Sequence, residues 1–415
     1  MRILVLDGNE NQAVASVRAL ARAGHRVAVG AGTSWSKAGW SRACAEQFQY
    51  PEPERDADAF VSSIAAQSAR EAGTLVLPMT EGTTLPLSSR RDRIAAAGGR
   101  MVLPLHATLV RAFDKKQMTE LAQTLDLDVP ATVMISSDAD ALECSRTLRY
   151  PVVLKPRSSV ESVAGGVRPT GRPIYARNAG ELLRGWRDLG VRCRSALAQE
   201  FIDGVGMGYF ALMRHGHLLA EFAHVRLRDV RPTGSGSSLR VSVTPDRRLR
   251  RGALAMLEAL AWHGVAMVEF RVRPDGTPVF LEVNGRFWNS LALAVFSGVD
   301  FPALIARLAE AGDPPAASSY RTGVRCRWLL GDIRHLVEVW RGAPAGYPGV
   351  FPNRLQTLAD VLLPVRGTYH DNFAWRDPMP ALGDWLHFLL HTLPRTARPP
   401  QAAEVWHAAG RSAHP

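Results

Sequence analysis

Two glutamates and one asparagine have residue types and a spacing that suit a metal ion. They lie in the stretch 263–289, which reads HGVAMVEFRVRPDGTPVFLEVNGRFWN. Two β-rich runs flank Asp275-Gly276, and an Asp-Gly pair between alternating apolar runs predicts a β-hairpin. A turn centred between Asp275 and Gly276 places Glu269 directly opposite Glu282, with both side chains on one face of the hairpin.

Opposed carboxylates have a chemical consequence, because two of them about 5 Å apart cannot both stay ionised unless a cation lies between them. Asn284 shares a strand face with Glu282 and adds a carbonyl oxygen, and Arg286 continues along that face. Oxygen ligands without His or Cys suit Mg²⁺. The alternative, a solvated two-stranded edge, is disfavoured because both glutamates stand between apolar neighbours. We therefore predict that Glu269, Glu282 and Asn284 bind a divalent metal.

The same residues resemble a known signature. Val-Glu-Phe, a turn and Leu-Glu-Val-Asn-Gly-Arg-Phe-Trp are similar to the metal-binding signature of ATP-grasp carboxylate–amine ligases, usually Glu followed by Glu-x-Asn-x-Arg. The resemblance implies an α/β chain with the ATP-grasp fold, α+β in the ATP-binding part. It further implies an N-terminal Rossmann-like pre-ATP-grasp domain and covers about residues 1–310. The composition beyond Gly312 predicts a C-terminal, mostly helical appendage. The implied cofactors are ATP and Mg²⁺, with Mn²⁺ as a substitute ion, and the implied catalytic residues include Arg286.

Arginine carries nearly all of the net charge of +11, so lysine is rare in this chain. We expect the few lysines to be the residues that contact phosphates. Lysine is a compact point charge that commonly binds phosphate. Lys155 ends the apolar run 150–156, where a lysine is rarely buried without a partner. We expect it to contact a phosphate and to take part in catalysis; the alternative is an edge lysine that reaches solvent. Lys115 follows Asp114, a predicted helix cap, and the resemblance places Lys115 at the family's nucleotide-binding lysine.

Two loops are predicted from their glycine and serine content. The segment 157–173 is rich in Gly, Ser and Arg and is predicted to be a mobile loop. The resemblance implies that it is a flap over the phosphates, with Gly165 and Gly166 as hinge or backbone donors. The segment 231–242 has too much Gly and Ser for regular structure and lies between predicted strands, so we expect a lid. It resembles a Pro-Thr-Gly-Gly-x-Ser-Thr segment of one ATP-grasp subgroup, the predicted carboxylate–amine ligases, which implies that it orders over the acyl phosphate or its amine acceptor.

The segment 196–204, ALAQEFIDG, resembles the interdomain hinge of the family. The resemblance implies that Glu200 and Ile202 present a backbone carbonyl and a backbone amide to adenine. The chain departs from the family pattern after this point, where many relatives carry a ribose-binding acid a few residues beyond the glycine. Asp203 is the substitute that the sequence offers.

The N-terminal segment 1–30 reads as strand, turn, helix and strand, the opening of a parallel sheet. Its turn lacks G-x-G-x-x-G, which argues against a nicotinamide-dependent Rossmann enzyme. The segment 80–84 follows a predicted strand at 74–79, at the edge where such sheets bind ligands. Glu81 and Thr83 are therefore either substrate contacts or part of a helix cap.

The expected organisation has four parts. They are a pre-ATP-grasp domain at 1–112, a small ATP-grasp subdomain at 113–195, a large subdomain with the metal site at 196–315, and a C-terminal helical region with a disordered tail at 316–415. Helices are predicted at 328–341, 354–363 and 381–393. Tryptophans and arginines alternate in this last region, which suggests a peripheral membrane contact; the apolar face of helix 328–341 favours a packed core instead.

Composition narrows the function classes. We find no signal peptide and no run of about 18 apolar residues that could span a membrane. The four scattered cysteines are typical of a reducing cytoplasm, and no nucleic-acid-binding motif is present. The resemblance implies a ligase that phosphorylates a small-molecule carboxylate and joins it to an amine, in a chain compatible with a homodimer. The alternatives are an ATP-dependent carboxylase of the biotin carboxylase type and a non-catalytic nucleotide-binding protein.

Overall fold

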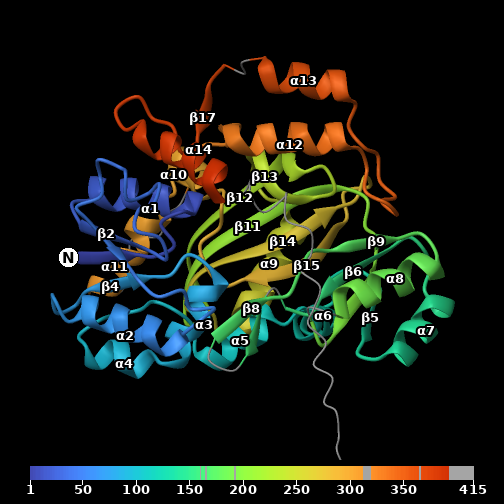
Figure 1. Cartoon of the computed structure of the whole chain (residues 1–415), viewed down its shortest axis with the longest axis horizontal. Helices are drawn as coiled ribbons and strands as arrows, with labels where there is room; N and C mark the ends of the chain where they lie inside the picture. Colours follow the sequence, from blue (N-terminus) through green and yellow to red (C-terminus); the bar gives the residue numbers. More distant parts are fainter. Residues whose placement is uncertain (159, 164–165, 191–192, 312–318, 364–365, 392–415) are drawn as a thin grey trace, which may run out of the picture.

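The strands of the described chain form sheets of four, four, seven and two strands (Figure 1). The computed structural model describes residues 1–158, 160–163, 166–190, 193–311, 319–363 and 366–391. The predicted disordered tail and Gly165 lie outside these residues. The expected α/β class is confirmed.

The N-terminal sheet is parallel, with strand order β3-β2-β1-β4. Its strands are β1 (Arg2–Val5), β2 (Arg26–Ala31), β3 (Glu46–Gln49) and β4 (Leu75–Leu77). Its helices are α1 (Asn11–Arg22), α2 (Ala57–Ser68), α3 (Glu81–Ser89), α4 (Arg91–Ala96) and α5 (His106–Phe113). Alternate residues of β1 enter different cores, since Ile3 packs with α1 and Leu4 packs with α2. The sheet is therefore covered on both faces, as parallel sheets usually are.

The small subdomain is an antiparallel sheet with order β5-β10-β6-β9. Its strands are β5 (Thr132–Ile135), β6 (Val152–Pro156), β9 (Ile174–Ala176) and β10 (Ala196–Glu200). Helices α7 (Asp138–Thr147) and α8 (Ala179–Gly190) pack on it, and α6 (Lys115–Thr124) precedes it. Strand β10 belongs to this sheet. A boundary between the small and large subdomains after residue 204 therefore follows the sheets more closely than the expected boundary at 196.

The sequence predicts a loop at 157–173, but the described residues of this segment include a hairpin of β7 (Val160–Val163) and β8 (Gly166–Pro169); its mobility stays a prediction. The hairpin contacts the N-terminal domain, because a Cβ added to Gly166 would lie 2.4 Å from the Glu54 carbonyl oxygen. Glycine is needed there for close packing between two backbones.

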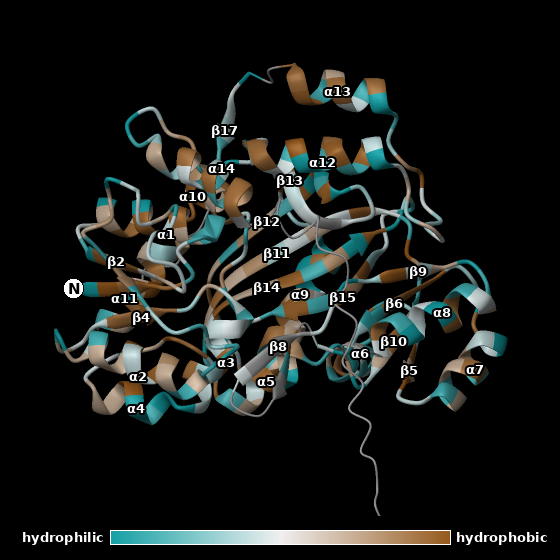
Figure 2. Ribbon diagram, viewed as in Figure 1, coloured by the Kyte–Doolittle hydropathy of each residue, from teal (hydrophilic) through white to brown (hydrophobic). Residues whose placement is uncertain are grey.

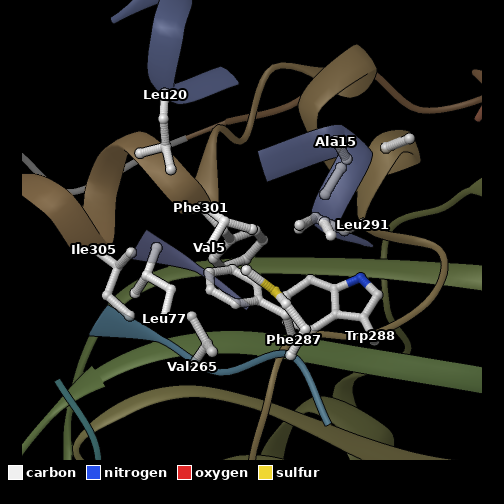
Figure 3. Packing of buried hydrophobic residues seen from close by; sticks show 14 of the residues in the cluster. Val5, Ala15, Leu20, Leu77, Val265, Phe287, Trp288, Leu291, Phe301 and Ile305 are labelled. Atoms are coloured by element: carbon white, nitrogen blue, oxygen red, sulfur yellow. The ribbon is translucent and has the colours of Figure 1, made fainter. Parts of the chain in front are cut away.

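The large sheet has the order β15-β14-β11-β12-β13-β16-β17. Its first five strands are β11 (Val205–Arg214), β12 (His217–Arg231), β13 (Ser235–Ser242), β14 (Gly264–Val272) and β15 (Pro278–Asn284). Helix α9 (Arg247–Ala259) covers one face, and α10 (Leu291–Ser297) and α11 (Phe301–Ala311) cover part of the other. Figure 3 shows Phe287, Trp288 and Phe301 packed between this sheet and the N-terminal strands.

The prediction that 231–242 lacks regular structure is also wrong, whereas its role as a lid stays a prediction. Arg231 ends β12, Pro232–Gly234 form a turn, and Ser235–Ser242 form strand β13, which pairs with β12 on one side and β16 on the other. Neighbouring strands satisfy the backbone hydrogen bonds of this Gly- and Ser-rich segment, and that outweighs its weak β propensity.

The C-terminal region is integrated into the large sheet. Its elements are β16 (Arg325–Arg327), α12 (Leu329–Arg341), α13 (Arg354–Leu362), β17 (Thr368–His370) and α14 (Met379–His391). The three predicted helices are confirmed within two residues at each bound. Buried ion pairs join this region to the sheet, from Arg240 to Asp371 and from Arg228 and Arg327 to Asp332. The region is therefore part of the core fold, with two strands in the sheet.

Some apolar side chains of the C-terminal region stay exposed. Figure 2 shows hydrophobic residues on the outermost helix, α13, where the exposed fractions of Leu355 and Leu362 are 75% and 69%. Trp375 is 89% exposed, whereas Trp328 is partly buried and donates a hydrogen bond to Asp384.

Within the described residues, no single helix is long and apolar enough to cross a membrane. The pair of α10 and α11 meets that test only when the two are taken together, and it is bent by 87°.

Candidate active site

Glu269 and Glu282 face each other across β14 and β15, as predicted. The turn itself differs from the prediction: it spans Arg273 to Thr277, with the Arg273 N–H donating to the Thr277 carbonyl at 2.9 Å. That turn alone would bring Glu269 opposite Leu281. A β-bulge between Glu269 and Phe270 shifts the register by one residue and restores the glutamate pair.

A cleft of about 400 Å³ lies on this face of the hairpin. Its wall brings together most of the sequence-predicted site residues, namely Lys115, Lys155, Glu200, Ile202, Glu269, Glu282, Asn284 and Arg286. Two predicted residues lie elsewhere. Asp203 is exposed and is not among the lining residues, and Gly166 packs against the N-terminal domain.

The small subdomain supplies the two lysines. Asp114 caps α6 by accepting from the backbone N–H groups of Lys116 and Gln117, as predicted, and Arg157 pairs with the same carboxylate. The cap fixes the first turn of α6 and so directs Lys115 into the cleft, where its Nζ lies 3.5 Å from Glu282 Oε2. Lys155 enters the same space from the end of β6.

Glu282 is held ionised by its neighbours. Burial raises its pKa, but the charges of Lys115 and Lys155, a 3.1 Å hydrogen bond from Asn284 Nδ2 and the charge of Arg286 outweigh burial and lower the pKa to about 2. A carboxylate that stays charged at all physiological pH values is suited to binding a cation.

Lys155 shows the opposite balance. Burial lowers its pKa from 10.5 to about 8, with the attraction of Glu282 and Glu269 opposing burial and the repulsion of Lys115 and Arg271 adding to it. The charged form of Lys155 is therefore less favourable in the folded protein than in water. An anion bound beside Lys155 would stabilise its positive charge.

Glu269 pairs with Arg226, whose Nη2 lies 2.8 Å from its Oε2. Arg226 also lies 3.8 Å from Asp229, and burial raises the pKa of Asp229 to about 6 although Arg226 and Arg271 oppose the rise. Sequence reasoning missed Arg226, because only the pairing of β12 with β11 places it beside β14.

Arg286 links the hairpin to the N-terminal domain. Its guanidinium donates to Asn284 Oδ1 at 3.3 Å and lies 3.8 Å from Glu81 Oε1. Thr80 caps α3, and Thr83 donates to Asp7 at the end of β1. The sequence left two interpretations open for Glu81 and Thr83, as substrate contacts or as part of a helix cap. Thr83 belongs to the capped first turn of α3, whereas Glu81 is linked to the cleft by its contact with Arg286.

The residues at the hairpin fit Mg²⁺. Among the described residues, no group of three or more His, Cys, Asp or Glu is placed to hold a metal ion. The set here is two carboxylates and one amide oxygen, all at the cleft. Mg²⁺ uses such a sparse set when phosphates and water complete its octahedron.

Two glycines of β11 that sequence reasoning left without a role pair with residues that line the cleft. Gly208 lies between Glu269 of β14 and His224 of β12, and Gly206 pairs with Arg271. A Cβ on Gly206 would lie 3.0 Å from the Arg226 side chain, and a Cβ on Gly208 would lie 2.4 Å from the Phe210 ring. Their i, i+2 spacing on the strand face of the glutamates was the available signal.

Comparisons with known proteins agree with this architecture, although no protein-family model matches the chain. The carbamoyl phosphate synthase large chain of Methanothermobacter thermautotrophicus is 26% identical over 247 residues. The match covers 56% of this chain and 22% of the relative, so the chain spans less than a quarter of that protein's length.

Solved structures show the same fold. The biotin carboxylase domain of Hydrogenobacter thermophilus 2-oxoglutarate carboxylase, in complex with MgADP and bicarbonate, matches with a TM-score of 0.60 and 15% identity over 78% of this chain and 73% of that chain. The L-amino acid ligase of Bacillus licheniformis matches with a TM-score of 0.56 and 19% identity over 74% and 73%. The two lysines, the opposed glutamates and the Glu-x-Asn-x-Arg strand thus stand in a chain that shares the fold of these solved structures and is similar in sequence to a carbamoyl phosphate synthase large chain.

Proposed function

We propose that this protein is an ATP- and Mg²⁺-dependent carboxylate–amine ligase. The supporting observation is that Lys115, Lys155, Glu282, Asn284 and Arg286 converge on one cleft from different sheets and helices. The reaction activates a small-molecule carboxylate as an acyl phosphate and joins it to an amine, with release of ADP and phosphate. The ligases and carboxylases among the similar proteins support this assignment.

The residues divide the work by charge. Lys155 and Lys115 bind the phosphates of ATP. Binding is favoured because a phosphate stabilises the charge of Lys155, which burial makes unfavourable in the ligand-free protein. Glu269, Glu282 and Asn284 would hold Mg²⁺, which would neutralise charge on the transferred phosphoryl group. Arg286, fixed by Asn284 and Glu81, stabilises negative charge that develops on the substrate side of the cleft.

The base of ATP lies along the wall formed by Gln199 to Ile202. Glu200 and Ile202 present a backbone carbonyl and a backbone amide to adenine. The exposed position of Asp203 outside the lining residues weakens its assignment to the ribose.

The test is ADP release with ATP, Mg²⁺ and pools of carboxylic acids and amines. The proposal predicts release that requires one acid and one amine together and that is lost in Glu282→Gln. Lys116→Met is the matched control, because Lys116 lies one residue from Lys115 but does not line the cleft. ADP release that never depends on an amine contradicts the ligase assignment.

A second candidate is ATP-dependent carboxylation, favoured by the structural match to a biotin carboxylase domain. Bicarbonate dependence of ADP release, without an amine requirement, supports this candidate over the ligase. ATP binding without turnover in any pool supports a nucleotide-binding protein instead.

A further inference from the structure

An aromatic cluster joins the C-terminal region to the wall of the cleft. Tyr175 of β9 and Phe201, just after β10, both line the cleft, and their ring centroids are 6.2 Å apart. Tyr347, between α12 and α13, meets both rings edge to face, at 5.0 Å from Tyr175 and 5.9 Å from Phe201. Edge-to-face pairs at such distances are favourable. The three rings form one packed unit, and two of them belong to the cleft wall.

The backbone beside Tyr347 makes an equally close contact. Gly346 is buried with φ +76°, and a Cβ added to it would lie 2.4 Å from the Tyr175 carbonyl oxygen and 2.8 Å from Glu181 Oε2. A side chain at 346 would therefore separate the C-terminal segment from β9.

The turn between β12 and β13 meets the same cluster. The Tyr175 hydroxyl donates to the Thr233 carbonyl at 2.8 Å, and the Tyr347 hydroxyl donates to the Pro232 carbonyl at 3.5 Å. The small subdomain, the large sheet and the C-terminal region thus converge at one end of the cleft. This end includes the hinge segment after β10, through which the chain passes from one sheet to the other.

We infer that Tyr347 is a positioning residue for the nucleotide and acts through Tyr175 and Phe201. By holding these two rings, the C-terminal region keeps the small subdomain closed against the large sheet. Without the Tyr347 ring, ATP must order Tyr175 and Phe201 when it binds, and affinity falls. The inference rests on the proposed ATP site. It means that part of the affinity of this site for ATP comes from the segment around Tyr347, about 150 residues beyond the hinge.

The experiment compares ATP affinity in Tyr347→Ala and Tyr347→Phe by isothermal titration calorimetry. The alanine variant is expected to raise the Kd about tenfold, and the phenylalanine variant, which keeps the ring, to stay within about twofold of the unmodified protein. Where turnover is measurable, the KM for ATP rises with the Kd while kcat changes little. Should Tyr347→Ala fail to fold, Tyr347→Leu keeps apolar volume without a ring and takes its place.

The matched control is Tyr369→Ala, which removes a tyrosine of the same region that stacks on Phe296 and does not line the cleft. Its ATP affinity is expected to be unchanged. Equal Kd values for Tyr347→Ala and the unmodified protein overturn the inference, as does a Tyr347→Phe variant as weak as the alanine variant.

A second measurement separates this inference from the proposed function. If the unmodified protein does not bind ATP, the proposed function fails, and hydrogen exchange of the ligand-free protein decides the role of Tyr347. Faster exchange in β9 and in residues 201–204 of Tyr347→Ala supports the part of the inference that does not need ATP, namely that Tyr347 holds Tyr175 and Phe201 in place. Unchanged exchange there refutes it.

Discussion

Replacing Lys155 with methionine is expected to stabilise the ligand-free protein and to remove most of its affinity for ATP. Burial lowers the pKa of this lysine from 10.5 to about 8, so the folded state holds its proton less well than the unfolded state. At about 1.4 kcal/mol per pKa unit, the charged lysine destabilises the folded protein by about 3 kcal/mol at pH 7. Methionine fills similar space without a charge. Glu282 stays ionised in the variant, because Lys115 and Arg286 remain beside it.

The effect has a defined pH dependence. Because the folded pKa lies below the unfolded one, the penalty is complete below about pH 8, declines as the pH rises and is absent above about 10.5. The stability difference between Lys155→Met and the unmodified protein should fall from about 3 kcal/mol at pH 7.0 to about 1.5 kcal/mol at pH 9.5.

Urea unfolding at the two pH values measures the difference. Hydrogen exchange of β6 and β10 at pH 7.0 identifies the transition that contains the small subdomain, since a chain with several sheets need not unfold in one step. Calorimetry is expected to show ATP binding at least about tenfold weaker, because a charged contact to phosphate is lost. Lys116→Met, which removes a lysine that is 39% exposed, should change stability by less than about 0.5 kcal/mol. A variant that is no more stable at pH 7.0, or a difference that does not shrink at pH 9.5, refutes the reasoning.

Three further substitutions test other parts of the structure. Glu282→Gln should abolish ATP turnover across an Mg²⁺ titration, because one carboxylate holds the ion too weakly; near-normal ADP release at ordinary Mg²⁺ contradicts the metal assignment. Asp371→Ala leaves the fully buried Arg240 without its carboxylate, so urea unfolding should show a loss of about 3–5 kcal/mol, and a loss below about 1 kcal/mol argues against this ion pair. Lys37→Met removes a buried lysine 2.8 Å from Asp384 that does not line the cleft, so its melting temperature should fall while its ATP Kd, unlike that of Lys155→Met, stays within about twofold. Equal losses of ATP affinity in Lys37→Met and Lys155→Met would show that the cleft is misassigned.

Local chemistry made much of the site predictable from the sequence. Glu269 and Glu282 stand between apolar residues in strands on either side of an Asp-Gly turn, and these features require only neighbouring residues. Asp114 caps its helix because a short acidic side chain reaches the next backbone N–H groups without help from distant segments. The C-terminal helices follow from apolar residues at helical spacing.

Long-range pairing decided the rest. Ser235–Ser242 has the composition of a loop and becomes a strand because β12 and β16 supply hydrogen-bond partners from both sides. Arg226 reaches Glu269 across an intervening strand, where Gly206 leaves room for its side chain: a Cβ at 206 would lie 3.0 Å from Arg226. The bulge that restores the glutamate pair is a feature of the strand pairing that the Asp-Gly turn does not predict.

The sequence by itself therefore determined which side chains carry the chemistry and which elements hold them, since hydrophobic periodicity, capping and turn chemistry act over a few residues. Only the tertiary structure decided how the C-terminal region joins the large sheet, where Asp332 and Asp371 neutralise buried arginines of β12 and β13. The physical reason is that a buried charge requires a partner, and the chain places that partner more than 100 residues away, where no local pattern records it.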